Sequence, residues 1–171
     1  LQRQYNVETF KVPRNTPSRK IIFERERPND FEQLQEMVVR EVVEIQNKYR
    51  PVLVILDSIN RVDQISKWFP DCGIIKGTDP QKEREVIANA GKSRAVTIAT
   101  LAAGRGMDIK LDKRAKEVGG LHVIVPYLMP NVRALEQAIG RSGRQGQPGS
   151  ATVYVDKNDK YELSIEFHET H

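Results

Sequence analysis

The fold is decided by a five-residue run, Val52-Leu53-Val54-Ile55-Leu56, in which every side chain is apolar. A strand with one solvated face alternates apolar and polar residues, whereas a strand covered on both faces is apolar throughout. This run, which is rich in β-branched residues, therefore predicts a parallel strand buried inside a sheet. Similar short apolar runs at Ala95–Thr100 and Leu121–Val125 predict two more such strands.

Helical patterns alternate with these strands. Apolar residues recur at steps of three and four over residues 31–49, which is the period of an amphipathic helix, and Asp30 stands where it would cap the start. Two further helices are expected over residues 62–69 and 80–90, the second capped by Asp79. Parallel strands need crossover connections, and strands buried on both faces need helices on each face. The sequence therefore predicts an α/β fold with an open, mainly parallel sheet and helices on both faces.

The two ends of the chain are assigned separately. Residues 1–25 contain extended pieces around a proline-rich turn, and we expect a lead-in strand or linker from a preceding motor domain there. Residues 26–171 are expected to form a single domain. Toward its end, Thr152–Val155 and the alternating run Tyr161–Phe167 predict a hairpin or a pair of edge strands.

The composition fits one globular domain with its own core. The chain has 171 residues, of which 39% are hydrophobic and 29% charged, and its formal net charge is +4. Its apolar runs are far shorter than the roughly 20 residues that a transmembrane helix needs. Cys72 is the only cysteine, which excludes an internal disulfide and a cysteine-ligated zinc site and favours a reducing compartment. The chain begins at Leu1 rather than at a methionine, and we expect a piece of a longer protein.

Open parallel sheets bind ligands at the carboxyl ends of their strands, so ligand-binding motifs are expected in the loops there. Gly91-Lys92-Ser93 has the last three residues of a phosphate-binding loop. Position 86 holds valine instead of the required glycine, and the triplet follows a helix rather than a strand. This stretch is therefore interpreted as a helix end with a solvated lysine.

A glycine-rich loop, Gly104-Arg105-Gly106-Met107-Asp108, follows the strand at Ala95–Thr100. The two glycines let a backbone approach a ligand closely, and the Asp108 carboxylate can accept from a ribose hydroxyl or an arginine. Ile109 stands where a dinucleotide-binding motif needs its third glycine. Taken alone, this segment is interpreted as a turn.

Two arginines, Arg141 and Arg144, lie three residues apart in a stretch with glycines on both sides. This spacing places both guanidinium groups on one side of a helical turn, where they could converge on a phosphate. An arginine always carries its charge and matches phosphate oxygens in pairs, which suits phosphoryl transfer. Composition alone weighs this interpretation equally against a basic surface turn.

Together, the two stretches resemble motifs five and six of superfamily 2 helicases and translocases. The match is closer still to the second nucleotide-binding fold of the SecA family of preprotein translocase motors. The stretches that carry this resemblance are Val96–Thr100, Ala103–Gly106, Asp108–Leu111, Glu117–Ile124 and Gly140–Gly146. The chain departs from the usual family pattern at Leu101, Ala102 and Met107 and over Val125–Arg133, which indicates a divergent member.

The resemblance implies a RecA-like domain of the helicase C-terminal type that supplies the arginine side of an interdomain ATP site. In this scheme Arg141 and Arg144 reach the ATP phosphates, Arg144 is the arginine finger, and Gln137 supports them. Binding of ATP with Mg²⁺ falls mainly to a first RecA-like domain of the same chain, and no metal site is expected here. The residues implied to line the nucleotide cleft are Gly104, Arg105, Gly106 and Asp108.

The implied protein is an ATPase that moves unfolded preprotein through a membrane translocation channel, from the cytoplasm or the membrane periphery. The fragment alone should be inactive, since it has neither a phosphate loop nor an acidic magnesium motif. Two alternatives stay open. One is a nucleic-acid helicase of the same superfamily, which the net charge of +4 supports weakly and the low aromatic content of 6% argues against. The other is a catalytically inactive, nucleotide-regulated binding module.

Overall fold

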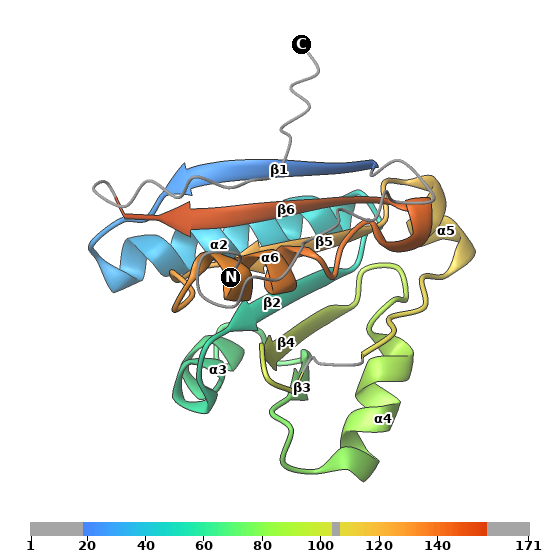
Figure 1. Cartoon of the computed structure of the whole chain (residues 1–171), viewed down its shortest axis with the longest axis horizontal. Coiled ribbons are helices and arrows are strands. Elements are labelled where there is room, and N and C mark those ends of the chain that lie inside the picture. The colour runs from blue at the N-terminus through green and yellow to red at the C-terminus, as the bar shows by residue number, and fades with distance from the viewer. Residues whose placement is uncertain (1–18, 104–106, 157–171) are drawn as a thin grey trace, which may run out of the picture.

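The computed structural model describes residues 19–103 and 107–156, and these form a single six-stranded sheet covered by helices (Figure 1). All five strand pairings are parallel, and the strand order is β1-β6-β5-β2-β4-β3. The predicted α/β class with an open parallel sheet is confirmed. The strands are β1 (Arg19–Glu26), β2 (Val52–Leu56), β3 (Gly73–Ile75), β4 (Val96–Thr100), β5 (Leu121–Val125) and β6 (Pro148–Val155).

Helices cover both faces of this sheet, as predicted. Alternate residues of β2 explain why its run is wholly apolar: Val52, Val54 and Leu56 pack with α2 and α3, whereas Leu53 and Ile55 pack with α6. Side chains of α4 join the same cluster as α6. The helices are α2 (Phe31–Asn47), α3 (Ile59–Ser66), α4 (Pro80–Asn89), α5 (Lys113–Glu117) and α6 (Val132–Ile139), with a 3₁₀ turn, η1, at Arg144–Gly146.

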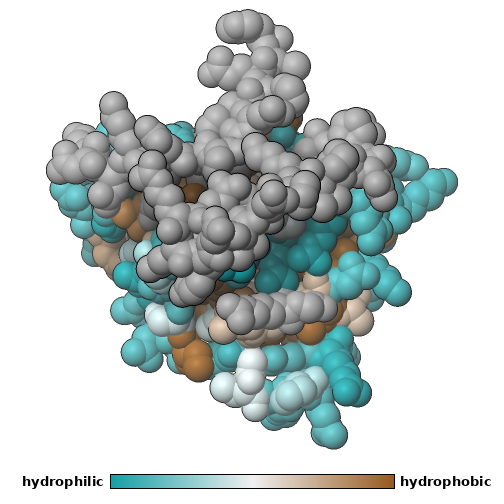
Figure 2. Space-filling view, in the orientation of Figure 1, coloured by the Kyte–Doolittle hydropathy of each residue, from teal (hydrophilic) through white to brown (hydrophobic). Residues whose placement is uncertain are grey.

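The predicted helix caps are present. The Asp30 side chain accepts a hydrogen bond from the backbone N–H of Glu32 (2.9 Å), and that of Asp79 accepts from Lys82 (3.2 Å). α4 has no buried residue, and the surface where it lies is largely hydrophilic in Figure 2. None of the helices in the described ranges is long and apolar enough to span a membrane.

The prediction for the C-terminal strand is wrong in one respect. β6 pairs with β5 on one side and with β1 on the other, so it lies inside the sheet and is no member of an edge hairpin. β1 takes the edge position, and the boundary predicted between residues 25 and 26 falls within this strand. The predicted partner strand, Tyr161–Phe167, lies outside the described residues.

Short elements were not foreseen. β3 has three residues and α5 has five, which is too short for hydrophobic periodicity to register. The stretch Gly91-Lys92-Ser93 lies between α4 and β4, so its order is that of a helix–strand connection and not of a phosphate loop. Gly91 owes its identity to close packing, since a Cβ there would overlap the backbone carbonyl of Lys110.

Candidate functional site

The predicted arginines lie in the connection between α6 and β6, residues 140–147, here called the arginine turn. α6 is capped by Asn131, whose side chain accepts a hydrogen bond from the backbone N–H of Ala134 (2.9 Å). Leu135, Ala138 and Ile139 are buried against the sheet, which fixes the rotation and the end point of the helix. The arginine turn therefore starts from a rigid support.

The backbone of the arginine turn does not continue the helix. Gly143, Gln145 and Gly146 have φ angles of 60°, 54° and 74°, in the left-handed region that glycine adopts most easily. The hydroxyl of Ser142 donates to the carbonyl oxygen of Ile139 (3.0 Å), and the N–H of Gln147 donates to that of Arg144 (3.0 Å). The turn is thus folded on itself, and the two arginines do not lie on the continuous helical turn that their spacing suggested.

Arg141 is buried, with 8% of its surface exposed. Its Nε and Nη1 atoms have no hydrogen-bond partner in the part of the chain that the structure describes. Burial, with a smaller contribution from the charge of Arg144, lowers the pKa of Arg141 from its usual value. Burying a guanidinium without a hydrogen-bond acceptor costs free energy. A bound anion would accept hydrogen bonds from Nε and Nη1 and would balance the positive charge of Arg141.

Arg144, in contrast, is exposed and donates to two backbone carbonyls. Its Nε bonds to the oxygen of Gly140 (3.2 Å), and its Nη1 bonds to that of Met107 (3.0 Å). Met107 belongs to the glycine-rich stretch after β4 and is itself buried. The structure therefore brings the two predicted motifs into direct contact across 37 residues of sequence.

The other predicted site residues are not tied to the arginines. Gln137 is half-buried on α6, and Asp108 is exposed. Within the described ranges, neither side chain makes a hydrogen bond or an ion pair. The predicted residues Gly104, Arg105 and Gly106 lie outside the described residues.

The arginine turn lies at the edge of the sheet opposite the carboxyl ends of the strands, where ligand-binding loops were expected. It precedes β6, and Gly149, two residues after it, pairs with Leu121 at the start of β5. This is the amino-terminal edge, because the segment connects a helix to a strand. Ligand binding at the carboxyl ends of parallel strands is therefore expected of the segment after β4 and not of the two arginines.

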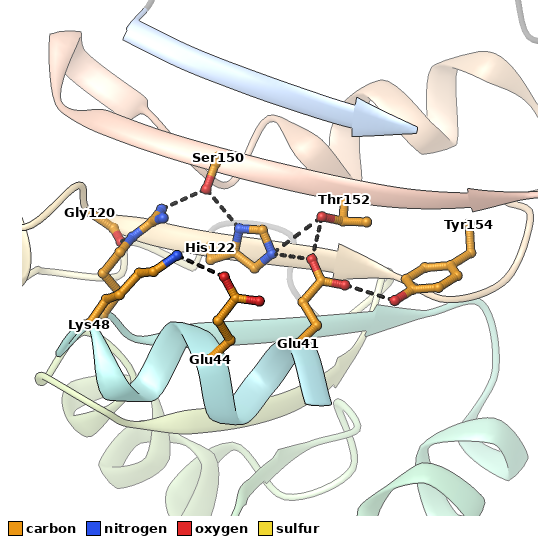
Figure 3. A network of polar contacts seen from close by, with 9 residues as sticks. Glu41, Glu44, Lys48, Gly120, His122, Ser150, Thr152 and Tyr154 are labelled. Atoms are coloured by element: carbon orange, nitrogen blue, oxygen red, sulfur yellow. Dashed lines mark hydrogen bonds and ion pairs between the residues drawn. The ribbon is translucent and has the colours of Figure 1, made fainter. Parts of the chain in front are cut away.

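A second polar cluster, which the sequence analysis did not identify, lies between α2 and the strands β5 and β6 (Figure 3). The Glu41 carboxylate accepts hydrogen bonds from Nε2 of His122 (2.9 Å), from the hydroxyl of Tyr154 (2.8 Å) and from the hydroxyl of Thr152. Nδ1 of His122 lies 2.7 Å from the hydroxyl of Ser150. These five side chains, here called the Glu41 network, are all buried. No substrate can reach them, so His122 is a structural residue.

The donor of each hydrogen bond in the Glu41 network can be assigned in order, starting from Arg50 and ending at Glu41. Arg50 donates from Nε to the Gly120 carbonyl (2.9 Å) and from Nη2 to the Ser150 hydroxyl (2.6 Å). Ser150 in turn donates to Nδ1 of a neutral His122, which leaves Nε2–H to donate to Glu41. The network therefore connects a half-buried guanidinium to a buried carboxylate through neutral groups.

Burial and hydrogen bonding act on the two titratable members of this network. Burial lowers the pKa of His122 from its usual value, against the opposing effect of Glu41. For Glu41, burial raises the pKa, but the hydrogen bonds from His122, Thr152 and Tyr154 outweigh it, so the net pKa is lowered. One sequence signal could have revealed the network, because Glu41 interrupts the apolar stripe Leu34, Val38, Val42, Ile45 of α2 on its buried face.

These shifts predict a stability that falls in acid. A group with a lowered folded-state pKa contributes stability above its unfolded pKa and loses it as the pH falls. The loss from His122 should begin below its unfolded pKa of 6.5, and that from Glu41 below 4.5. Urea unfolding of the chain should show a slope of up to about 1.4 kcal/mol per pH unit below pH 6.5. His122→Gln should flatten the first part of this decline, and an unchanged slope would contradict the assignment.

Solved structures with the same fold are helicase domains. The Escherichia coli DEAD-box protein SrmB matches with a TM-score of 0.60 and 23% sequence identity, covering 84% of this chain and 79% of that chain. The C-terminal domain of the DEAD-box protein Dbp5 matches with a TM-score of 0.63 and 16% identity, covering 85% and 82%. At these identities the likeness establishes the fold, a RecA-like domain of helicase type.

Sequence relatives are subunits of a protein translocase. Protein translocase subunit SecA 2 of Rhodopirellula baltica is 37% identical over 163 residues, covering 93% of this chain and 25% of the relative. Protein translocase subunit SecA of Syntrophus aciditrophicus is 35% identical over 168 residues, covering 93% and 19%. This chain thus spans a fifth to a quarter of the length of these relatives. The SecA P-loop domain family matches residues 29–117, more than half of the chain, and the chain therefore belongs to that family.

Proposed function

We propose that the chain is the second RecA-like motor domain of an ATP-driven protein translocase and supplies the arginine side of an interdomain ATP site. The family match and the relatives support the translocase assignment. One observation carries the site: the buried Arg141 guanidinium has two N–H-bearing atoms without an acceptor in the described part of the chain, beside the charged side chain of Arg144. Such a pair is suited to bind an anion with several oxygens.

The two arginines have different roles in this proposal. Arg141 is fixed by burial, so it orients a phosphate group and neutralises charge in the ground state. Arg144 is exposed and bonded only to carbonyl oxygens, which phosphate oxygens can replace because they are charged acceptors. It is therefore the finger that stabilises charge developing in the transition state. Gln137, one helical turn before Arg141, supports the pair, and the cleft is lined by Gly104, Arg105, Gly106 and Asp108.

The nucleotide is ATP with Mg²⁺, held mainly by a first motor domain. Mg²⁺ supplies charge neutralisation on the β- and γ-phosphates when bound. Within the described ranges, no group of three carboxylate, histidine or cysteine side chains is close enough to hold a metal. The partners we propose are that first domain, an unfolded preprotein and a membrane translocation channel, at the cytoplasmic side of the membrane.

ATP turnover by the full-length protein tests this function. We expect stimulation by an unfolded polypeptide and none by single-stranded RNA, whereas the 171-residue chain alone should show no turnover because it lacks a phosphate loop. Stimulation by RNA alone would assign the protein to the helicases. Absence of turnover under every condition would leave a binding module, and turnover by the isolated chain would refute the shared site.

A further inference from the structure

Gly149, the second residue of β6, faces the backbone of the arginine turn. A Cβ atom on Gly149 would lie under 3.0 Å from the Gly143 nitrogen, 3.0 Å from the Gly143 Cα and 3.1 Å from the Ser142 carbonyl carbon. Ordinary contacts of a Cβ begin at about 3.4 Å, so this surface of β6 has no room for a side chain. The peptide that joins Ser142 to Gly143, midway between the two arginines, therefore lies directly on β6.

We infer that this contact positions Arg141 and Arg144, and that Gly149 is a positioning residue for ATP hydrolysis. The inference rests on the proposed function of the two arginines. Gly149 touches no substrate in this scheme. Because Gly149 has no side chain, the arginine turn can lie close to β6, and the two guanidinium groups can then reach their observed positions.

Neither side of the contact can yield by rotating a side chain, because all three nearest atoms belong to the backbone. Gly149 is held by register pairing to Lys20 of β1 and Leu121 of β5. On its other side the turn is attached to the buried end of α6 and closed by the Ser142–Ile139 hydrogen bond. An added methyl group must therefore displace the turn itself.

The size of the displacement makes a catalytic effect measurable. Restoring an ordinary contact distance requires the peptide to move by about 1 Å, and a misplacement of that size can cost roughly 100-fold in rate. The movement would change the approach of Arg144 to Met107 and of Arg141 to its anion together. Binding of ATP by the first motor domain would be unaffected.

Gly73, on β3 at the far edge of the sheet, offers a matched control. A Cβ there would lie 2.5 Å from Cγ1 of Val86, so Gly73→Ala also creates steric conflict in a strand. The neighbour in this case is a side chain on α4. In the sheet, β3 is separated from β6, the strand that follows the two arginines, by β5, β2 and β4. Both variants should lower the melting temperature, but only Gly149→Ala should alter catalysis.

The test compares steady-state ATP hydrolysis by the full-length protein and its variants. Gly149→Ala should lower kcat by about 10- to 100-fold with little change in KM for ATP, while Gly73→Ala keeps the kcat of the unmodified protein. Gly149→Ala should lower kcat by a smaller factor in the Arg144→Ala background than in the unmodified protein, because one of the two side chains that Gly149 positions is then absent. The inference would be overturned if Gly149→Ala lowered kcat by the same factor with and without Arg144. It would also be overturned if Gly149→Ala left kcat unchanged.

A second variant perturbs the same peptide more gently. Gly143→Ala places a methyl group 3.2 Å from the Cβ of Lys20, on the side of β1, and remains the test if Gly149→Ala does not fold. It should lower kcat, again by a smaller factor in the Arg144→Ala background, and an unchanged kcat would overturn the inference. A normal rate in Arg144→Ala and Arg141→Ala would instead refute the proposed function, so the two failures are distinguishable.

Discussion

Replacing Arg144 with alanine in the full-length protein should lower kcat for ATP hydrolysis by roughly 1,000-fold or more, the range observed for arginine fingers. In the proposed function, this guanidinium stabilises charge that develops on the phosphoryl oxygens only in the transition state. The KM for ATP should change little, because in the proposed function binding of the ground state falls mainly to the first motor domain. Single-turnover hydrolysis and equilibrium binding of ATP, measured separately, distinguish the two effects.

Loss of structure should not account for this effect. Arg144 is exposed, and its hydrogen bonds to the carbonyls of Gly140 and Met107 are worth about 1 kcal/mol of stability each at most in such a setting. Arg133 on α6 is the matched control, because it is exposed and forms no ion pair with the described residues. Arg133→Ala should hydrolyse ATP normally, and an Arg144→Ala enzyme that does the same would remove Arg144 from the mechanism.

Arg144→Lys refines the same experiment. Lysine keeps the charge but presents a compact ammonium, which cannot bond two phosphate oxygens in the plane that a guanidinium provides. We therefore expect only partial recovery of the rate. Full recovery would mean that net charge suffices, and the finger geometry would then be unnecessary.

The sheet was predictable where packing is purely apolar. The β2 run is apolar on both faces because α2 and α6 cover both, and the sequence carries that information directly. β6 was misplaced because the alternating run Tyr161–Phe167 after it predicted a hairpin partner, and because β6 itself carries the polar residues Ser150 and Thr152. Both hydroxyls are in fact buried and bonded within the Glu41 network, and only the fold reveals partners 111 residues apart in sequence.

The site was predictable in its residue types but not in its geometry. Spacing and glycines identified Arg141 and Arg144, yet their different exposure follows from the left-handed backbone at Gly143, which interrupts the helical arrangement assumed from the spacing. The contact of Arg144 with Met107 depends on how two loops pack, and no local pattern encodes it. Gly149 is a similar case, because a glycine chosen for close approach looks the same in sequence as one chosen for a turn.

The other large effect should come from Glu41, which serves folding rather than catalysis. Glu41→Ala removes the common acceptor of His122, Thr152 and Tyr154, all buried, and leaves three donors without a partner. Unsatisfied buried donors and a broken buried charge network each carry large penalties, so we expect a loss of about 3–5 kcal/mol in the free energy of unfolding. The single tryptophan, Trp68, packs against the same core as α2 and reports the urea transition by fluorescence.

Glu44 lies one turn further along α2 and separates burial from charge as the cause. It pairs with Lys48 at 2.8 Å, but both side chains are more than half exposed, so Glu44→Ala should leave the urea midpoint nearly unchanged. Tyr154→Phe removes one donor of the Glu41 network and should cost less than Glu41→Ala, since the carboxylate keeps its other two hydrogen bonds. Equal midpoints for Glu41→Ala and Glu44→Ala would mean that the buried carboxylate adds nothing, and the Glu41 network could not be what holds α2 to β5 and β6.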